Sequence, residues 1–128
     1  MLSKWGTYPV FFESATENVH PDDLTGFLKE THNCKVYECT GYDEFYITIK
    51  YGDNCYRVKR EFFKSTKAPK FQFGQKVALM DRSDQDAAIT GIMWHYEKEE
   101  HYYFVMIDGK NKSKRYSESE LRICPRHI

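Results

Sequence analysis

Apolar and polar residues alternate along much of this chain, and alternation with a period of two residues predicts β-strands. The clearest example places Phe45, Ile47 and Ile49 on one face of a strand that ends just before the turn residues 52–54. These turn residues are Gly, Asp and Asn, which favour a tight hairpin. Residues 55–58 are therefore predicted to return as the next strand.

The remainder of the first half is less regular. A short apolar run at residues 8–12 predicts a first strand. Asp22 or Asp23 is expected to cap a short helix that continues to about Glu30, because carboxylate side chains accept hydrogen bonds from the first backbone N–H groups of a helix. A further strand is predicted at residues 35–40.

The second half is divided more clearly by turn residues. We predict a polar loop at 81–86, a charged hairpin turn at 97–100, a tight Asp-Gly turn at 108–111 and a 3₁₀ turn at 117–120. The predicted strands lie between these turns, within 71–80 and at 87–96, 101–107, 113–116 and 121–123. All of them are short, so this half is predicted to form one small β domain.

The two halves of the chain end in similar ways. Residues 45–63 and 102–121 each contain an aromatic-rich strand, a Gly-containing turn, a short basic strand and an acidic turn closed by an apolar residue. A repeated unit of this kind predicts two small β modules in tandem. The expected organisation is a first module at 1–64 with a short helical insertion, a linker at 65–70, a second module at 71–123 and a tail at 124–128.

The second module resembles the small SH3-like or Tudor-like barrels found in uncharacterised bacterial proteins. The resemblance rests on residues 73–77, on 103–105 before the Asp-Gly pair at 108–109, and on 115–116 before 118–121. It implies a mostly β fold in which residues 71–123 form a five-stranded barrel. Tudor-like modules use aromatic rings to hold cationic or methylated side chains, so the resemblance also implies an interaction surface.

The composition narrows the classes of partner. The chain of 128 residues carries 19 basic and 19 acidic residues, so its formal net charge is zero. A protein dedicated to nucleic acid usually has a basic surplus, and nucleic acid is therefore not the expected partner. The N-terminal residues lack the apolar stretch of a signal peptide, and no segment is apolar over the length of a bilayer. We therefore expect a cytoplasmic protein with no membrane partner.

Cysteine and histidine residues are the candidate metal ligands. His32 lies close in sequence to Cys34 and Cys39, and Cys124 and His127 form a C-x-x-H pair. Structural zinc needs four converging ligands, and the usual C-x-x-C pair is missing. We therefore expect no metal and interpret the cysteines as small core or strand residues.

Catalytic motifs are also missing from the sequence. It contains no nucleophile elbow, phosphate-binding loop, HExxH motif or dinucleotide fingerprint. We expect a protein that is not an enzyme and that needs no cofactor. The remaining catalytic alternative is a cysteine-dependent enzyme in which Cys39 or Cys55 pairs with His32 or His95.

Aromatic residues gather around one predicted hairpin of the second module. We predict a binding surface there that includes Trp94, Tyr96 and Tyr103, because such rings are common at the energetic centres of interfaces. The alternative is that these rings form the core and cross-strand pairs of the module.

A basic segment in the same module extends this predicted surface. Lys110, Lys112 and Arg115 are candidate contacts for a partner, or else solvated charges balanced by nearby acidic residues. The function we expect is a non-catalytic protein-interaction module that uses an aromatic and charged surface of a small β-barrel. The alternatives are a bacterial immunity or inhibitor protein that blocks a toxin, and a nucleic-acid-binding adaptor. The sequence leaves the partner's identity and the oligomeric state open.

Overall fold

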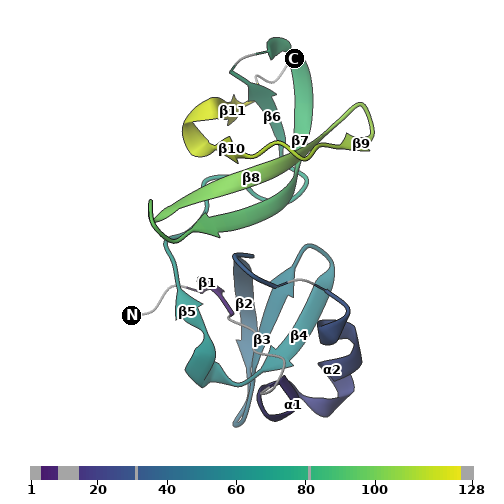
Figure 1. Cartoon of the computed structure of the whole chain (residues 1–128), viewed down its shortest axis with the longest axis vertical. Coiled ribbons are helices and arrows are strands. Elements are labelled where there is room, and N and C mark those ends of the chain that lie inside the picture. Colours follow the sequence, from purple (N-terminus) through teal and green to yellow (C-terminus); the bar gives the residue numbers. More distant parts are fainter. Residues whose placement is uncertain (1–3, 9–14, 31, 81, 125–128) are drawn as a thin grey trace. The chain divides into compact units, whose positions relative to one another are not determined.

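The computed structural model describes residues 4–8, 15–30, 32–80 and 82–124. The chain is mostly β, as predicted, with two antiparallel sheets (Figure 1). It divides into two compact units, Met1–Ala68 and Pro69–Ile128. Among the described residues, no helix is long and apolar enough to cross a membrane.

The first unit contains a five-stranded sheet and two short helices. Its elements are β1 (Trp5–Thr7), α1 (Ala15–Asn18), α2 (Pro21–Leu28), β2 (Tyr37–Tyr42), β3 (Ile47–Tyr51), β4 (Asn54–Val58), the 3₁₀ helix η2 (Arg60–Phe62) and β5 (Lys64–Ser65). The strand order is β4-β3-β2-β1-β5, which places the last strand beside the first. The first strand lies at residues 5–7, before the predicted run at 8–12, of which residues 9–12 lie outside the described residues.

The helix prediction was right about the element and wrong about its cap. The residue that precedes the helix is His20, whose Nδ1 accepts a hydrogen bond from the backbone N–H of Asp22 at 3.0 Å. Pro21 occupies the first helical position, where its fixed φ is favourable and its lack of an N–H has no cost. The carboxylate of Asp23 is thereby left available for a contact outside the helix.

The core of the first unit lies between the sheet and the helices. Its buried side chains are Tyr8, Val19, Phe27, Tyr37, Ile47, Ile49, Tyr56 and Val58. Of the three residues predicted to share one face of a strand, Ile47 and Ile49 are buried, whereas Phe45 is 71% exposed. The reason is that β3 begins only at Ile47, so Phe45 belongs to the turn before it.

The outer edge of β4 is covered by the segment that joins the two helices, and α2 lies beside this strand in Figure 1. Val19 forms an antiparallel bridge with Val58. The N–H of His20 donates to the carbonyl oxygen of Arg57 at 2.9 Å, and the N–H of Lys59 donates to that of Asn18 at 2.8 Å. An uncovered strand edge invites pairing with other chains, so this segment protects the sheet.

The second unit contains a six-stranded sheet and no α-helix among its described residues. Its elements are β6 (Lys76–Leu79), β7 (Arg82–His95), β8 (Glu100–Ile107), β9 (Lys110–Asn111), β10 (Tyr116–Ser117), the 3₁₀ helix η3 (Glu118–Glu120) and β11 (Leu121–Ile123). The main order is β10-β8-β7-β6-β11, and β9 pairs with β8. The last strand again lies beside the first strand of its unit, so both sheets have the same order apart from β9.

The polar loop predicted at residues 81–86 was wrong, because β7 already begins at Arg82. These polar residues form part of the strand because their backbone pairs with β6. Asp86 lies opposite Ala78, and Arg82 lies opposite Leu79. A bulge separates these two pairs, and a second bulge follows Ile89. Bulges bend a strand, which allows one long strand to pair with both neighbours.

The sheet of the second unit encloses its own apolar core. The fully buried residues include Phe71, Val77, Leu79, Ile89, Ile92, Tyr103 and Val105. The predicted 3₁₀ turn is present as η3, with a capping box between Ser117 and Glu120. Among the described residues, the two end strands β10 and β11 do not pair with each other, so closure into a barrel is not observed.

The segment predicted to be a linker begins inside the first unit. Ser65 belongs to β5, and the next N–H, that of Thr66, donates to the carbonyl oxygen of Trp5 at 2.8 Å. Because β5 pairs with β1, this segment closes the edge of the first sheet.

The pairing of β1 with β5 requires a glycine at position 6. A Cβ at Gly6 would lie 2.7 Å from Cζ of Phe63 and closer still to the carbonyl oxygen of Lys64. We therefore expect Gly6→Ala to lower the free energy of unfolding by about 1–3 kcal/mol, the usual cost of overpacking. Urea denaturation measures the change. The control is Gly41→Ala, because a Cβ at Gly41 meets no atom within 4 Å. Equal stability of the two variants would contradict this account of the pairing.

Candidate functional site

The residues that the sequence predicted to form one binding surface lie in different places in the structure. Tyr103 is fully buried, since alternate residues of β8 point into the core. Its hydroxyl donates to Oε2 of Glu118 at 2.8 Å and accepts from the N–H of Lys70 at 3.0 Å. Burial raises the pKa of Tyr103 far above its ordinary value. Tyr103 is therefore a core residue and is not available to a partner.

Trp94 and Tyr96 lie near the turn that joins β7 to β8. The Trp94 ring is half-buried and packs edge-on against the buried His101, with the ring centres 4.9 Å apart. The Tyr96 side chain, just beyond the end of β7, is 50% exposed. Of these two residues, Tyr96 is the more exposed to solvent.

The three basic residues of the predicted surface, Lys110, Lys112 and Arg115, do not lie together either. Lys110 and Lys112 are exposed, and β9, which contains Lys110, pairs with the end of β8 at Met106 and Ile107. Arg115 lies instead against Tyr102, near the beginning of β8, with its guanidinium carbon 5.1 Å from the ring centre. The predicted basic segment is therefore extended along β8 and is not a single patch.

Tyr102 was not among the predicted binding residues. It lies on the outer face of β8, opposite in direction to Tyr103, and its ring packs edge-on against Phe104 and His95 with centres 6.0 and 6.4 Å apart. The sequence already indicated this difference, because two consecutive tyrosines of a strand point to opposite faces of the sheet. We call the side chains of His95, Tyr102, Phe104 and Arg115 the Tyr102 surface.

A hollow of about 260 Å³ opens beside this surface. It is lined by His95, Lys98, Glu100, His101, Tyr102, Arg115, Ser117 and Glu120. The lining contains both cations and carboxylates, and one carboxylate is already engaged: Oε1 of Glu120 accepts from the N–H of Ser117 at 3.0 Å. A mixed lining of this kind suits a polar side chain of a partner better than a strongly charged ligand.

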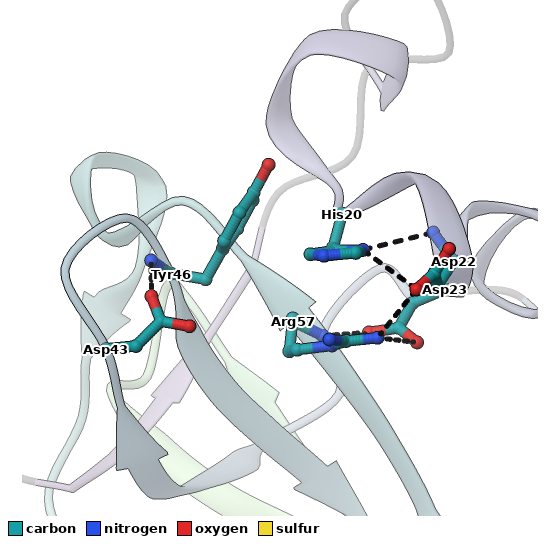
Figure 2. Close-up of polar contacts among 6 residues, drawn as sticks. All are labelled: His20, Asp22, Asp23, Asp43, Tyr46 and Arg57. Atoms are coloured by element: carbon teal, nitrogen blue, oxygen red, sulfur yellow. Dashed lines mark hydrogen bonds and ion pairs between the residues drawn. The ribbon is translucent and has the colours of Figure 1, made fainter.

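A second group of polar residues lies in the first unit, where Figure 2 shows His20, Asp22, Asp23 and Arg57 between α2 and β4. Asp23 Oδ2 accepts from both the backbone N–H and Nε of Arg57 at 2.8 Å, and Oδ1 accepts from a terminal guanidinium nitrogen at 3.2 Å. This guanidinium holds the pKa of Asp23 below its ordinary value, and the carboxylate in turn raises the pKa of Arg57. The pair fastens the first turn of α2 to the edge strand.

His32 and Cys39, two of the residues considered for catalysis, have other hydrogen-bond partners. The buried ring of His32 stacks on Phe27 with centres 3.8 Å apart, and its nitrogens bond the Tyr37 hydroxyl and the Phe27 carbonyl oxygen. Burial lowers the pKa of His32, which favours the neutral ring. The Cys39 thiol donates to the carbonyl oxygen of Gly41 at 3.6 Å.

The remaining candidate metal ligands are also dispersed. All four cysteines are free thiols, and the described residues contain no group of three His, Cys, Asp or Glu side chains placed to hold a metal ion. Cys124 donates from Sγ to Oδ1 of Asp86 at 3.1 Å, and this hydrogen bond raises the thiol pKa. His127, its C-x-x-H partner in the sequence, lies outside the described residues.

Comparison with known proteins identifies a family without identifying an activity. The chain belongs to DUF6960, a family of unknown function, which matches residues 1–122. No curated protein and no solved structure matches the chain significantly.

The contact between Asp23 and Arg57 predicts how stability depends on pH. Because the folded pKa of Asp23 is lowered, its contribution is present above the unfolded value of about 3.9 and is lost as the pH falls through the folded value. Asp23→Asn should lower the free energy of unfolding at pH 7 by about 1 kcal/mol, a small value because the carboxylate is partly exposed. The difference from the unmodified chain should shrink as the pH falls through the folded pKa of Asp23.

Urea denaturation at several pH values measures this dependence. The matched control is Glu44→Gln, which neutralises an exposed carboxylate. A constant difference between Asp23→Asn and the unmodified chain at all pH values would contradict the assignment.

Proposed function

We propose that this member of a family of unknown function is a non-catalytic protein-interaction module that binds its partner through the Tyr102 surface. The observation that carries the proposal is the Arg115 guanidinium lying over the partly exposed Tyr102 ring, beside a hollow of about 260 Å³. Tyr and Arg are enriched among residues that dominate binding energy. Here they lie beside a depression that can receive a partner's side chain.

The position of the surface on a strand supports this role. Tyr102 belongs to β8, which has a hydrogen-bonded neighbour on either side, β7 and β10. A side chain fixed by a paired strand loses little conformational entropy when it binds, so more of the contact energy appears as affinity. The short strand β10 lies at the end of the sheet order, where an extended segment of a partner can also pair with the backbone.

We further propose that each unit is a variant of the SH3-like fold. The support is the common strand order of the two sheets and the 3₁₀ turn that precedes the last strand in each unit. Small folds of this kind bind partners at surface loops and sheet edges, and Arg115 directly precedes β10, the strand at one end of the sheet order. The fold alone selects no activity.

The interaction proposal is tested with Tyr102→Ala and Arg115→Ala. Both side chains lie on the outer face, so each variant should keep its melting temperature within a few degrees while binding the partner about tenfold more weakly. The partner is first captured from an extract of the native organism with the unmodified chain, and its affinity for each purified variant is then measured by calorimetry.

The matched control is Lys112→Ala, which removes an exposed cation away from the ring of Tyr102. A partner that binds Tyr102→Ala and the unmodified chain equally would contradict the proposed surface. If the captured partner is an enzyme that the chain inhibits, the narrower hypothesis of an inhibitor or immunity protein is supported within the same proposal.

A further inference from the structure

The hairpin tip between β2 and β3 presents two aromatic rings to solvent. Tyr42 is 79% exposed and Phe45 is 71% exposed, and no other large hydrophobic side chain among the described residues exceeds these values. Single exposed apolar residues are ordinary on a protein surface. Two such rings three positions apart on one turn are a feature that requires an explanation.

The turn between these rings is closed by hydrogen bonds. The N–H of Asp43 donates to the carbonyl oxygen of Tyr46 at 2.8 Å. Oδ1 of Asp43 accepts from the N–H of Phe45 at 2.8 Å and from that of Tyr46 at 2.7 Å. The same N–H groups lower the pKa of Asp43, so the carboxylate stays ionised. The backbone that carries both rings is therefore fixed before any partner binds.

The base of the tip is supported by the polar group of the first unit. Figure 2 shows Tyr46 beside His20, and their ring centres are 5.0 Å apart. His20 is in turn held by the hydrogen bond from its N–H to Arg57, which is itself bound to Asp23. The turn thus rests on the contacts that fasten α2 to the sheet.

The charge of the tip indicates the partner. Asp43 and Glu44, both exposed, lie between the two rings. A cation is close as well, since the guanidinium carbon of Arg60 lies 5.8 Å from the Tyr42 ring centre, and the exposed Glu61 follows it in sequence. The formal charge of these four groups is negative, and an acidic surface is complementary to a basic one.

We propose that residues 42–45 form a second binding surface, distinct from the Tyr102 surface, that inserts into a basic pocket of another protein. The Tyr42 and Phe45 rings fill the pocket, and the carboxylate of Glu44 faces its cations. Asp43 is a positioning residue, because its carboxylate closes the turn.

Site-specific cross-linking tests the proposal in the full chain. Phe45 is replaced by the photoreactive p-benzoylphenylalanine, and a second protein carries the same replacement at Tyr102. After irradiation in cells of the native organism, the expected product from position 45 is one heterologous protein, cross-linked at a concave site lined by Lys or Arg. No cross-link, a link to nucleic acid or a link to a second copy of the chain overturns the proposal.

Cross-linking from both positions, 45 and 102, tests this proposal and the proposed function separately. Cross-links only from position 102 leave the Tyr102 surface standing and remove the tip. Cross-links only from position 45 support the tip and count against the Tyr102 surface.

Affinity for the purified cross-linked protein then tests each side chain. Tyr42→Ala and Phe45→Ala should each weaken binding about tenfold without lowering the melting temperature, because the rings are exposed. Glu44→Lys should weaken binding and reduce its dependence on salt. The matched control is Ile123→Ala, an exposed apolar residue of the second unit, which should bind normally. Equal loss in Ile123→Ala would overturn the assignment to the tip.

The positioning role of Asp43 has a readout of its own. Asp43→Ala should speed amide hydrogen exchange at Phe45 and Tyr46 and weaken binding, while both rings remain present. Unchanged exchange at these amides would show that the carboxylate does not hold the turn.

Discussion

In the first unit, the carboxylate of Asp23 joins a helix to the edge of the sheet. It accepts two hydrogen bonds from the Arg57 side chain and one from its backbone N–H, a backbone group on the outer edge of β4. An edge strand with such unpaired groups is prone to pair with other chains. Because Asp23 and the neighbouring backbone of His20 occupy those groups, α2 is held against the sheet and the edge is covered at the same time. The support of the hairpin tip through Tyr46 follows from the same fixed position of His20.

In the second unit, a carboxylate at the start of a 3₁₀ helix satisfies polar groups in a similar way. Glu118, at the start of η3, accepts hydrogen bonds from the buried Tyr103 hydroxyl and from the N–H of Lys70. These contacts tie the beginning of the unit to the turn before its last strand, and β11 then pairs with β6. In each unit, one partly exposed carboxylate, that of Asp23 or Glu118, accepts hydrogen bonds from partly buried polar groups. Such groups would lower the stability of the fold if they were left without a partner. The difference lies in what is fastened: a helix to an edge strand in one case, and the beginning of the unit to the turn before its last strand in the other.

The sequence predicted strands well and side-chain partners poorly, for physical reasons that particular residues make clear. Alternation and turn residues are local, so β3, β4, β8 and the 3₁₀ turn at 118–120 could be read directly. The strand character of residues 82–86 depends on pairing with β6, which is not a local property. In the same way, the contact of Asp23 with Arg57 joins residues 34 positions apart in sequence, so the local helix signal did not reveal it. Tyr103 was placed on the predicted binding surface and is buried, because alternation fixes which residues share a face and not which face is buried.

The distribution of aromatic rings connects the fold to the proposed binding. Tyr8, Phe27, Tyr37, Phe71 and Tyr103 are buried to 2% exposure or less, which shows that both units use large rings to fill small cores. Tyr42, Phe45 and Tyr96 remain at least half exposed. Rings left outside a core contribute nothing to its packing, yet Tyr42 and Phe45 flank a turn that is closed by three hydrogen bonds. The ordering of that turn has an entropic cost that folding of the core does not require. Because this conformational entropy is already lost on folding, a partner that binds the turn gains affinity. This is the physical reason to seek a partner at the tip.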